Sequence, residues 1–402
     1  MRMRQHNRHR RRRLYKNEIK RLHLFRHLLH KKMNNDIYIY IHIPYCYKKC
    51  PYCAFVSFEK QFSTLDLYIN KLIKEIKSFK TAKTVKSIYF GGGTPSTLNP
   101  KHIESIINAV YLNFSIDKNP EITFEANPIS LKEQYLKSLN SIGINRLSIG
   151  IQSFLNKKLK TLGRLHDSSL GENAILKAKE IGFENISLDL IYGLYESKSD
   201  IEYELKKVCL LDIQHVSTYM LSVEKGTEFE KRLKNGSLRV SNDDEMADMY
   251  LFISEYLTSN GFEHYEISNF AKYGFESRHN CSYWLGYDYR GFGVSASSFI
   301  DGIRFSNTDS LKDYLSGKTV VFKEKLSKED RIKEAFVLML RTNKGVNIKE
   351  FDKMFDTDIK KLYGNTLQKF IDANLIIEKN GNLFLNGAKS MIISNAIFSE
   401  LI

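Results

Sequence analysis

The sequence predicts an α/β fold built on a parallel sheet, arranged either as an incomplete barrel or as a doubly wound sheet. From Met33 onward, short runs rich in β-branched and aromatic residues alternate with helical patterns in six units. Each unit spans roughly 30 residues, the length that a helical crossover between parallel strands requires. Polar or glycine-rich segments also follow the predicted strands, as is typical at the carboxyl ends of parallel barrels.

The elements follow one another in a regular order. Strands are predicted at Ile37–Ile43, Ser87–Phe90, Glu121–Glu125, Arg146–Gly150, Asn185–Leu190 and His215–Met220. Helices are predicted between and after them at Leu65–Phe79, Pro100–Tyr111, Leu131–Ile142, Ser168–Ile181, Lys198–Leu210 and Asp243–Asn260. In the first helix, apolar residues recur at the spacing of one helix face, which favours packing of that face against the sheet.

The net charge of +15 is concentrated in residues 1–32, which hold thirteen Lys or Arg and one acidic residue and so carry +12. Three interpretations compete for this basic tail: an upstream extension with Met33 as the true start, an organellar transit peptide, or a polyanion-binding arm. We favour the first. The tail lacks the serines of a transit peptide and the interleaved aromatics of a nucleic-acid platform.

The rest of the composition excludes several classes of protein. No apolar run is long enough to cross a bilayer, so we expect a soluble, cytoplasmic protein. Five cysteines, three of them in one short segment, do not form the even, dispersed pattern of a disulfide framework. With 42% hydrophobic residues, the chain can build one large core and a smaller one.

The first predicted strand ends in a cluster of thiols. Residues 38–43 alternate aromatic and β-branched residues, and Pro44 ends the strand. Cys46, Cys50 and Cys53 follow at once with the spacing C-x3-C-x2-C. Structural zinc would need a fourth ligand. Three thiolates can instead hold a 4Fe-4S cluster with one iron open to another ligand.

The other predicted strands also end in polar or glycine-rich residues. The candidates at these ends are Gly92, Gly93 and Thr94 after the second strand, Glu125 after the third, Gln152 after the fourth and Asp189 in the fifth. Taken singly, each has an ordinary structural interpretation as a turn residue or a helix cap. Because parallel strands end at one edge of the sheet, their combination with three cysteines favours a ligand site.

Residues 261–300 are irregular and rich in aromatic residues and glycine, as expected of a lid over the barrel. Within them, His279, Cys281 and Tyr283 carry side chains that can bind heme iron. A lone histidine is more often a hydrogen-bonded structural residue. Cys209, on an apolar helix face, is assigned to the core.

The C-terminal region predicts a separate helical module. Helices are expected at Glu329–Leu340, Ile348–Phe355 and Ile359–Ala373, and Asn380–Gly381 between two apolar runs indicates a hairpin. Helices followed by a hairpin resemble a winged helix. The last two helices lack a dense basic face, so a packing or substrate-covering role is favoured over specific nucleic-acid binding.

Several of these segments carry a specific resemblance. The cysteine spacing after the first strand, with GGGTP after the second, resembles the radical SAM enzymes. The wider set YIHIPYCYKKCPYC, IYFGGGTPS, FEANP, RLSIGIQSF, SLDLIYGL and SRHNCSYW is similar to the oxygen-independent coproporphyrinogen III oxidase-like proteins. The H-N-x-x-Y segment from His279 to Tyr283 is shared with the HemW heme chaperone group of that family.

The resemblance implies an incomplete (βα)6 TIM-type radical SAM barrel over residues 33–300 and a HemN-type, winged-helix-like domain over residues 301–402. It implies that Cys46, Cys50 and Cys53 bind a 4Fe-4S cluster whose open iron takes S-adenosylmethionine (SAM). The implied SAM contacts are Tyr40, Tyr52, Gly92, Gly93, Thr94, Glu125, Gln152, Arg164 and Asp189. His279 and Tyr283 are the candidate heme ligands.

One departure from the family decides between two functions. The true oxidases continue the cysteine motif as C-x3-C-x2-C-x-C, whereas Phe55 stands at the fourth cysteine position here. This favours a heme chaperone that delivers heme to apoproteins such as membrane-bound respiratory cytochromes. The alternative is a coproporphyrinogen III oxidase-type radical SAM oxidoreductase. A second copy of the chain is a further candidate partner.

Overall fold

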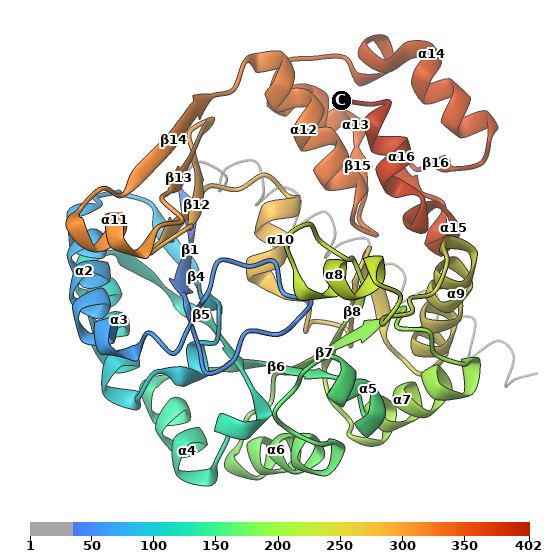
Figure 1. The fold of residues 1–402 in the computed structure, drawn as a ribbon. Helices are drawn as coiled ribbons and strands as arrows, with labels where there is room; N and C mark the ends of the chain where they lie inside the picture. The colour runs from blue at the N-terminus through green and yellow to red at the C-terminus, as the bar shows by residue number, and fades with distance from the viewer. Residues whose placement is uncertain (1–34) are drawn as a thin grey trace, which may run out of the picture.

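The computed structural model describes residues 35–402, and the predicted basic tail over residues 1–32 lies outside the described residues. Six parallel strands stand side by side in chain order, as the sequence predicts (Figure 1). They are β1 (Asp36–Ile43), β4 (Thr84–Gly92), β5 (Ser115–Ala126), β6 (Arg146–Gln152), β7 (Ile186–Tyr192) and β8 (His215–Met220). Because each strand neighbours the next one along the chain, the sheet has the order of a barrel and not of a doubly wound fold.

A helix follows each of the first five strands and covers the outer face of the barrel (Figure 1). These helices are α2 (Leu65–Ser78), α3 (Pro100–Asn113), α4 (Glu133–Ile142), α6 (Ser168–Ile181) and α7 (Lys198–Leu210). The helix ends follow from local sequence. Ser197 and Asp200 form a capping box that starts α7, and Gly143 and Gly182 adopt left-handed conformations that end α4 and α6.

The predicted lid segment instead extends the sheet at both edges. On one side, β11 (Tyr289–Phe292) pairs in parallel with β1 and leads to antiparallel β12 (Ser297–Ile300), β13 (Ile303–Asn307) and β14 (Val320–Lys325). On the other side, β10 (Asn269–Ala271) and β9 (Glu263–Glu266) follow β8. The result is one sheet of twelve strands within the described residues, and a direct β8–β1 pairing does not close it.

Other short elements connect these strands. They are β2 (Tyr45–Cys46), β3 (Phe58–Glu59), α5 (Asn156–Thr161), α8 (Glu228–Lys234), α9 (Asp243–Ser259), α10 (Arg278–Trp284), α11 (Leu311–Ser316) and the single-turn helices η1 (Phe62–Thr64), η2 (Pro95–Thr97) and η3 (Pro128–Ser130). Cys209, in α7, is half-buried and packs against the core. No helix within residues 35–402 is long and apolar enough to cross a membrane.

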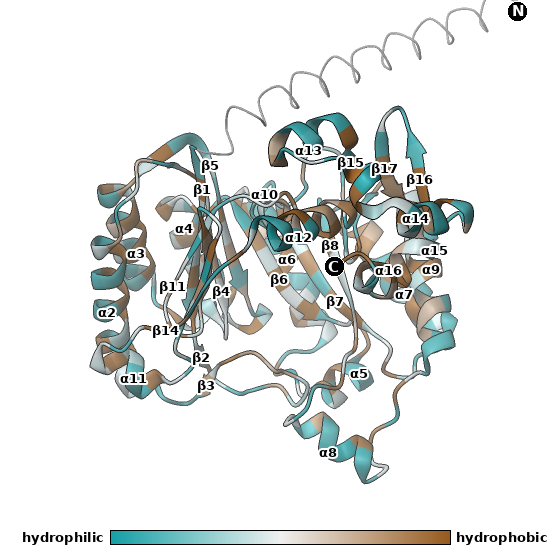
Figure 2. Ribbon diagram, turned by 90° about the horizontal axis from the view of Figure 1, so that it is seen from above, coloured by the Kyte–Doolittle hydropathy of each residue, from teal (hydrophilic) through white to brown (hydrophobic). Residues whose placement is uncertain are grey.

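The C-terminal region contains the predicted helices and hairpin. Its elements are α12 (Lys328–Leu340), β15 (Val346–Asn347), α13 (Ile348–Phe355), α14 (Ile359–Asp372), β16 (Ile376–Lys379), β17 (Asn382–Leu385), α15 (Gly387–Ile392) and α16 (Ser394–Ser399). Asn380 and Gly381 both have positive φ, as a two-residue hairpin turn requires. Figure 2 shows this region beside α9, on the side of the barrel away from α2 and α3, and α15 contacts α9.

Candidate functional site

Strand β1 presents two chemically different faces. Ile39, Ile41 and Ile43 are at most 1% exposed and belong to the core beneath the outer helices. Side chains in a strand alternate, so Tyr40 and His42 point to the opposite face, into the barrel. The hydroxyl of Tyr40 lies 3.1 Å from His42 Nδ1, and the other ring nitrogen of His42 lies 3.0 Å from a backbone carbonyl in the cysteine loop.

The three cysteines lie on the loop that leaves β1, and all three thiols are free. Cys46 Sγ lies 3.3 Å from Thr94 Oγ1, whereas Cys50 Sγ accepts a hydrogen bond from Arg164 Nη1 at 3.4 Å. Burial raises the pKa of the Cys46 and Cys53 thiols, and the nearby Cys50 raises both further. The loop therefore gathers three thiols beside two of the other predicted site residues.

The glycines after β4 allow close approach to the cysteine loop. Gly92 has φ of +111°, and a Cβ added there would lie 2.6 Å from the His42 ring. A Cβ on Gly93 would lie 2.9 Å from the carbonyl carbon of Pro44. No side chain fits at either position without a shift of its neighbours, so the two glycines allow this strand end to pack directly against β1 and the cysteine loop.

Two buried carboxyl groups face the barrel interior. Tyr89 donates a hydrogen bond to Glu125 at 2.8 Å, and Ser148 donates one to Asp189 at 3.3 Å. Burial raises the pKa of Glu125 to about 7, and the charge of Asp189 contributes to that rise. Burial likewise raises the pKa of Asp189 to about 6. Buried carboxylates favour a cationic neighbour, so this part of the interior suits a ligand with positive charge.

Arg164 joins the cysteine loop to the ends of two strands. Besides Cys50, its guanidinium donates hydrogen bonds to Asn127 Oδ1 at 2.5 Å and to the carbonyl of Gly150 at 2.8 Å. Arg164 is therefore a half-buried part of the site that ties three segments together. The remaining predicted residues lie nearby: Gln152 ends β6 with φ of +66°, and Tyr52 packs 5.9 Å from the ring of Phe229.

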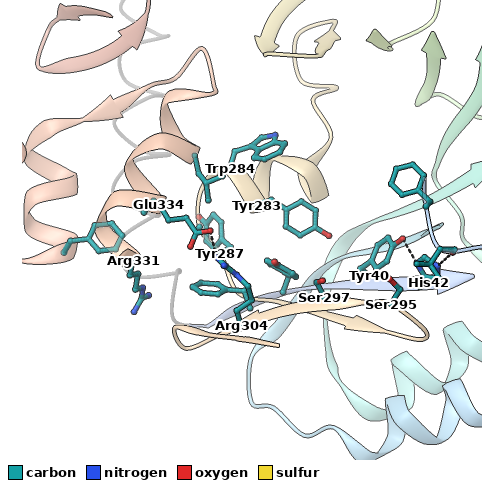
Figure 3. A pocket seen from close by; sticks show the side chains of 18 residues that line it. Tyr40, His42, Tyr283, Trp284, Tyr287, Ser295, Ser297, Arg304, Arg331 and Glu334 are labelled. Carbon is teal, nitrogen blue, oxygen red and sulfur yellow. Dashed lines mark hydrogen bonds and ion pairs between the residues drawn. The ribbon is translucent and has the colours of Figure 1, made fainter. Parts of the chain in front are cut away.

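A cavity of about 490 Å³ lies between the barrel and the C-terminal region (Figure 3). Tyr40 and His42 of β1 line one end. Its largely apolar walls come from Phe55 and Val56 of the cysteine loop, Tyr283 and Trp284 of α10, Phe299 of β12, Leu338 of α12 and Phe355 of α13. Phe55, the residue at the fourth cysteine position, is 69% exposed and borders this cavity.

Helix α10 is anchored to the barrel strands. Glu121 accepts the backbone N–H groups of Arg278 and His279, both at 3.0 Å, and so caps the start of the helix. His279 Nδ1 lies 2.7 Å from Ser87 Oγ, and its Nε2 lies 2.7 Å from the hydroxyl of Tyr283. Burial lowers the pKa of His279 to about 3. The histidine is a neutral, doubly hydrogen-bonded residue behind Tyr283.

Comparisons with known proteins agree with this architecture. The model of the radical SAM superfamily matches residues 40–208, and that of the HemN C-terminal domain matches residues 326–388. The heme chaperone HemW of Lactococcus lactis is 35% identical over 367 residues, which cover 90% of this chain and 96% of that protein. HemW of Bacillus subtilis is 34% identical, over 90% of this chain and 98% of that protein.

The chain belongs to the HemW family. The family predicted from the cysteine, glycine and H-N-x-x-Y segments is thus confirmed. The structure of coproporphyrinogen III oxidase (HemN) from Escherichia coli superposes with a TM-score of 0.81 at 22% identity, over 94% of this chain and 92% of that one. That likeness confirms the predicted radical SAM barrel as the fold.

Membership of the radical SAM superfamily implies a 4Fe-4S cluster and SAM, and the HemW-family site fits both. Within residues 35–402, no three His, Cys, Asp or Glu side chains are gathered as ligands of a single metal ion. A cubane cluster binds each thiolate on a different iron, so its thiols stand farther apart than the ligands of one ion. Three free thiols on one loop, bordered by bare glycine backbone and buried carboxyl groups, suit such a cluster with a cationic co-ligand.

The structure adds residues that the sequence did not single out. Asn127 holds Arg164, and its position two residues after the predicted Glu125 was the available signal. His42 lies on the same face of β1 as Tyr40, which the alternation of the strand could have indicated. Of the two candidate heme ligands in this HemW-family chain, Tyr283 lines the cavity, whereas His279 reaches it only through the hydroxyl of Tyr283.

Proposed function

We propose that this protein is a heme chaperone that binds heme in the cavity between α10, β13 and α12. The observation that carries the proposal is the cavity itself. Its volume of about 490 Å³ and its mostly aromatic and aliphatic walls suit a large, flat, apolar ligand. Tyr283 presents a phenol to the same space, and a phenolate is among the protein ligands of heme iron. The HemW names of the relatives agree with this cargo.

We propose Cys46, Cys50 and Cys53 as the ligands of the 4Fe-4S cluster. When bound, the cluster with SAM on its open iron supplies one-electron chemistry. The residues proposed to contact SAM are Tyr40, Tyr52, Gly92, Gly93, Thr94, Glu125, Gln152, Arg164 and Asp189. The contacts support three roles: the glycines let β4 pack closely against β1 and the cysteine loop, Glu125 attracts the cationic groups of the ligand, and Arg164 holds the loop against β5 and β6.

The recipients in this proposal are apo-hemoproteins, such as membrane-bound respiratory cytochromes, and the cytoplasm is the proposed site of transfer. His279 supports Tyr283 from behind, so we propose Tyr283 as the group nearer to the iron and His279 as its hydrogen-bond partner. Specific nucleic-acid binding forms no part of the proposed function. A homodimer stays a prediction.

The decisive experiment separates cargo binding from catalysis. Anaerobically reconstituted protein is titrated with heme and followed by absorbance. A second, heme-free sample of the reconstituted protein is incubated with coproporphyrinogen III, SAM and a reductant. We expect a saturable heme spectrum and no protoporphyrinogen. Protoporphyrinogen formation would favour the oxidase alternative, and the absence of any saturable heme spectrum would overturn the chaperone proposal.

The cluster ligands are tested by iron and sulfide content after reconstitution. Cys50→Ala should lose most of the iron and sulfide, because two thiolates and an arginine cannot hold a cubane. Cys209→Ala, at a half-buried thiol outside the loop, is the matched control and should retain them. Normal iron content in Cys50→Ala would refute the assignment.

A further inference from the structure

The cavity is chemically polarised along its length. Figure 3 shows Arg304 and Arg331 at one end, Tyr40 and His42 at the opposite end, and Tyr283 between them. Burial lowers the pKa of His42 to about 4, so its ring is uncharged at neutral pH. Both permanent cations that line the cavity are therefore at the end next to the C-terminal region.

Arg304, on β13, is held in an ion pair that a ligand can replace. Its guanidinium meets Glu334 of α12 and lies 3.7 Å from Glu324 of β14. The side chains of Arg304 and Glu334 are 34% and 37% exposed. Ion pairs this accessible to water contribute only about 0–1 kcal/mol, so a competing carboxylate can take over Arg304 at little cost.

Arg331, one turn before Glu334 on α12, reaches the same end of the cavity. Its guanidinium carbon lies 6.0 Å from the ring centre of Phe355 on α13. Its Nη1 lies 3.7 Å from the point where a Cβ on Gly302 would stand, in the turn between β12 and β13. The absence of a side chain at Gly302 leaves room beside this guanidinium.

We propose that Arg304 and Arg331 bind the two carboxylates of a tetrapyrrole dicarboxylate, and that Glu334 is a built-in competitor which gives up Arg304 when the ligand enters. The inference rests on the proposed function, since it takes heme as the cargo. Planar guanidinium groups match carboxylates in geometry and charge. The propionate edge then lies toward α12, and the apolar edge lies toward Tyr40 and His42.

The competing explanation is that Arg304 and Glu334 only clamp α12 against the sheet. The two explanations predict opposite results for Glu334→Gln. A competitor that loses its charge frees Arg304, so heme should bind more tightly, by about threefold. A broken clamp would loosen the cavity wall, and heme would bind more weakly.

The experiment compares heme with heme dimethyl ester, which keeps the ring and the iron but has no carboxylates. Wild-type protein should bind heme about tenfold more tightly than the diester, a factor that corresponds to about 1.4 kcal/mol. Arg304→Gln and Arg331→Gln should each lower this preference to about threefold, because each removes one of the two carboxylate contacts, while keeping their affinity for the diester. Arg232→Gln is the control, since Arg232 on α8 is similarly exposed at 39% and pairs with Glu228 at 3.3 Å.

The outcomes separate the two proposals. Wild-type protein that binds heme and the diester equally well would overturn the arginine assignment and leave heme binding standing. Wild-type protein that binds neither would overturn the proposed function itself. Reduced diester affinity in the arginine variants, with a lowered melting temperature, would identify a structural clamp and also overturn the assignment.

Discussion

His279 Nε2 and the hydroxyl of Tyr283 lie 2.7 Å apart within one turn of α10. The second ring nitrogen of His279 is engaged by Ser87, at 2.7 Å. A histidine ring nitrogen can bind a metal ion only when it is not already engaged in a hydrogen bond. The two members of the H-N-x-x-Y segment are thus unequal, because the tyrosine faces the cavity and the histidine orients it.

This inequality gives the first prediction. Tyr283→Phe keeps the aromatic wall but removes the phenol, so the heme absorbance maximum should shift and the affinity should fall about tenfold or more. His279→Gln preserves a hydrogen-bonding group behind Tyr283 and should cost less affinity. Parallel heme titrations measure both. A larger loss in His279→Gln than in Tyr283→Phe would contradict the assigned roles.

The second prediction concerns the glycine backbone beside the cysteine loop. A Cβ on Gly93 would lie 2.9–3.0 Å from backbone atoms of residues 43, 44 and 45, which cannot swing aside as a side chain can. Gly93→Ala should destabilise the protein by about 1–3 kcal/mol and lower its iron content. Gly171→Ala is the control, because the nearest atom to its Cβ would be the flexible end of Ile151 at 3.2 Å. Equal iron content and stability in the two variants would refute the prediction.

The third prediction concerns a buried ion triad. Lys158 on α5 is 5% exposed, and its Nζ lies 2.5 Å from Glu196 and 2.9 Å from Glu204. Lys158→Met would leave two buried carboxylates without their cation, which costs about 3–5 kcal/mol. Urea unfolding measures the loss. Lys137→Met breaks an exposed pair with Glu133 and should change stability by less than about 1 kcal/mol.

The fourth prediction is a loss of stability in acid. Burial lowers the pKa of His264 to about 4 from an ordinary value near 6.5. The unfolded chain takes up a proton there before the folded one does, so stability falls as the pH drops from about 6.5 toward 4. His42 and His166 act with the same sign, whereas the raised carboxyl pKa values of Glu125 and Asp189 oppose it.

His264→Gln isolates this effect, because His264 packs against Phe270 outside the proposed site. The variant should show a weaker loss of unfolding free energy between pH 7 and pH 4, by about 3 kcal/mol. Urea unfolding of the protein without heme at several pH values provides the measurement. An unchanged pH profile would contradict the prediction, because it would mean that His264 has the same pKa in the folded and the unfolded chain.

The sequence predicts those parts of the fold that leave a local pattern. The six strands and their helices repeat at regular intervals, and Asn380–Gly381 marks a turn by its residue types alone. The cysteine loop and the strand ends can also be predicted, because they too leave a local pattern in the sequence. Even so, the predicted strand starts at Glu121, whereas β5 begins at Ser115. The sequence hides this earlier part of the strand because Asp117 and Pro120 interrupt the apolar pattern.

The rest depends on contacts between distant segments. Strand β11 has only four residues, and nothing near Tyr289 indicates that it pairs in parallel with Tyr38 of β1. Arg304 and Glu334 come from a strand and a helix in different parts of the chain, so their meeting at the cavity has no local signal. Likewise, the sequence marks His279 as chemically notable, but only the structure shows that Ser87 occupies its second nitrogen.

The late pairing of β1 with β11 bears on how the protein is made. A ribosome that has completed β1 at Ile43 must still add the residues up to Tyr289 before the second edge of that strand can be covered. At about 5–20 residues per second, this interval lasts roughly 10–50 s. An apolar strand with an open edge is a template for wrong pairing. The nascent chain therefore carries its thiol loop on a strand with one open edge until synthesis is almost three-quarters complete.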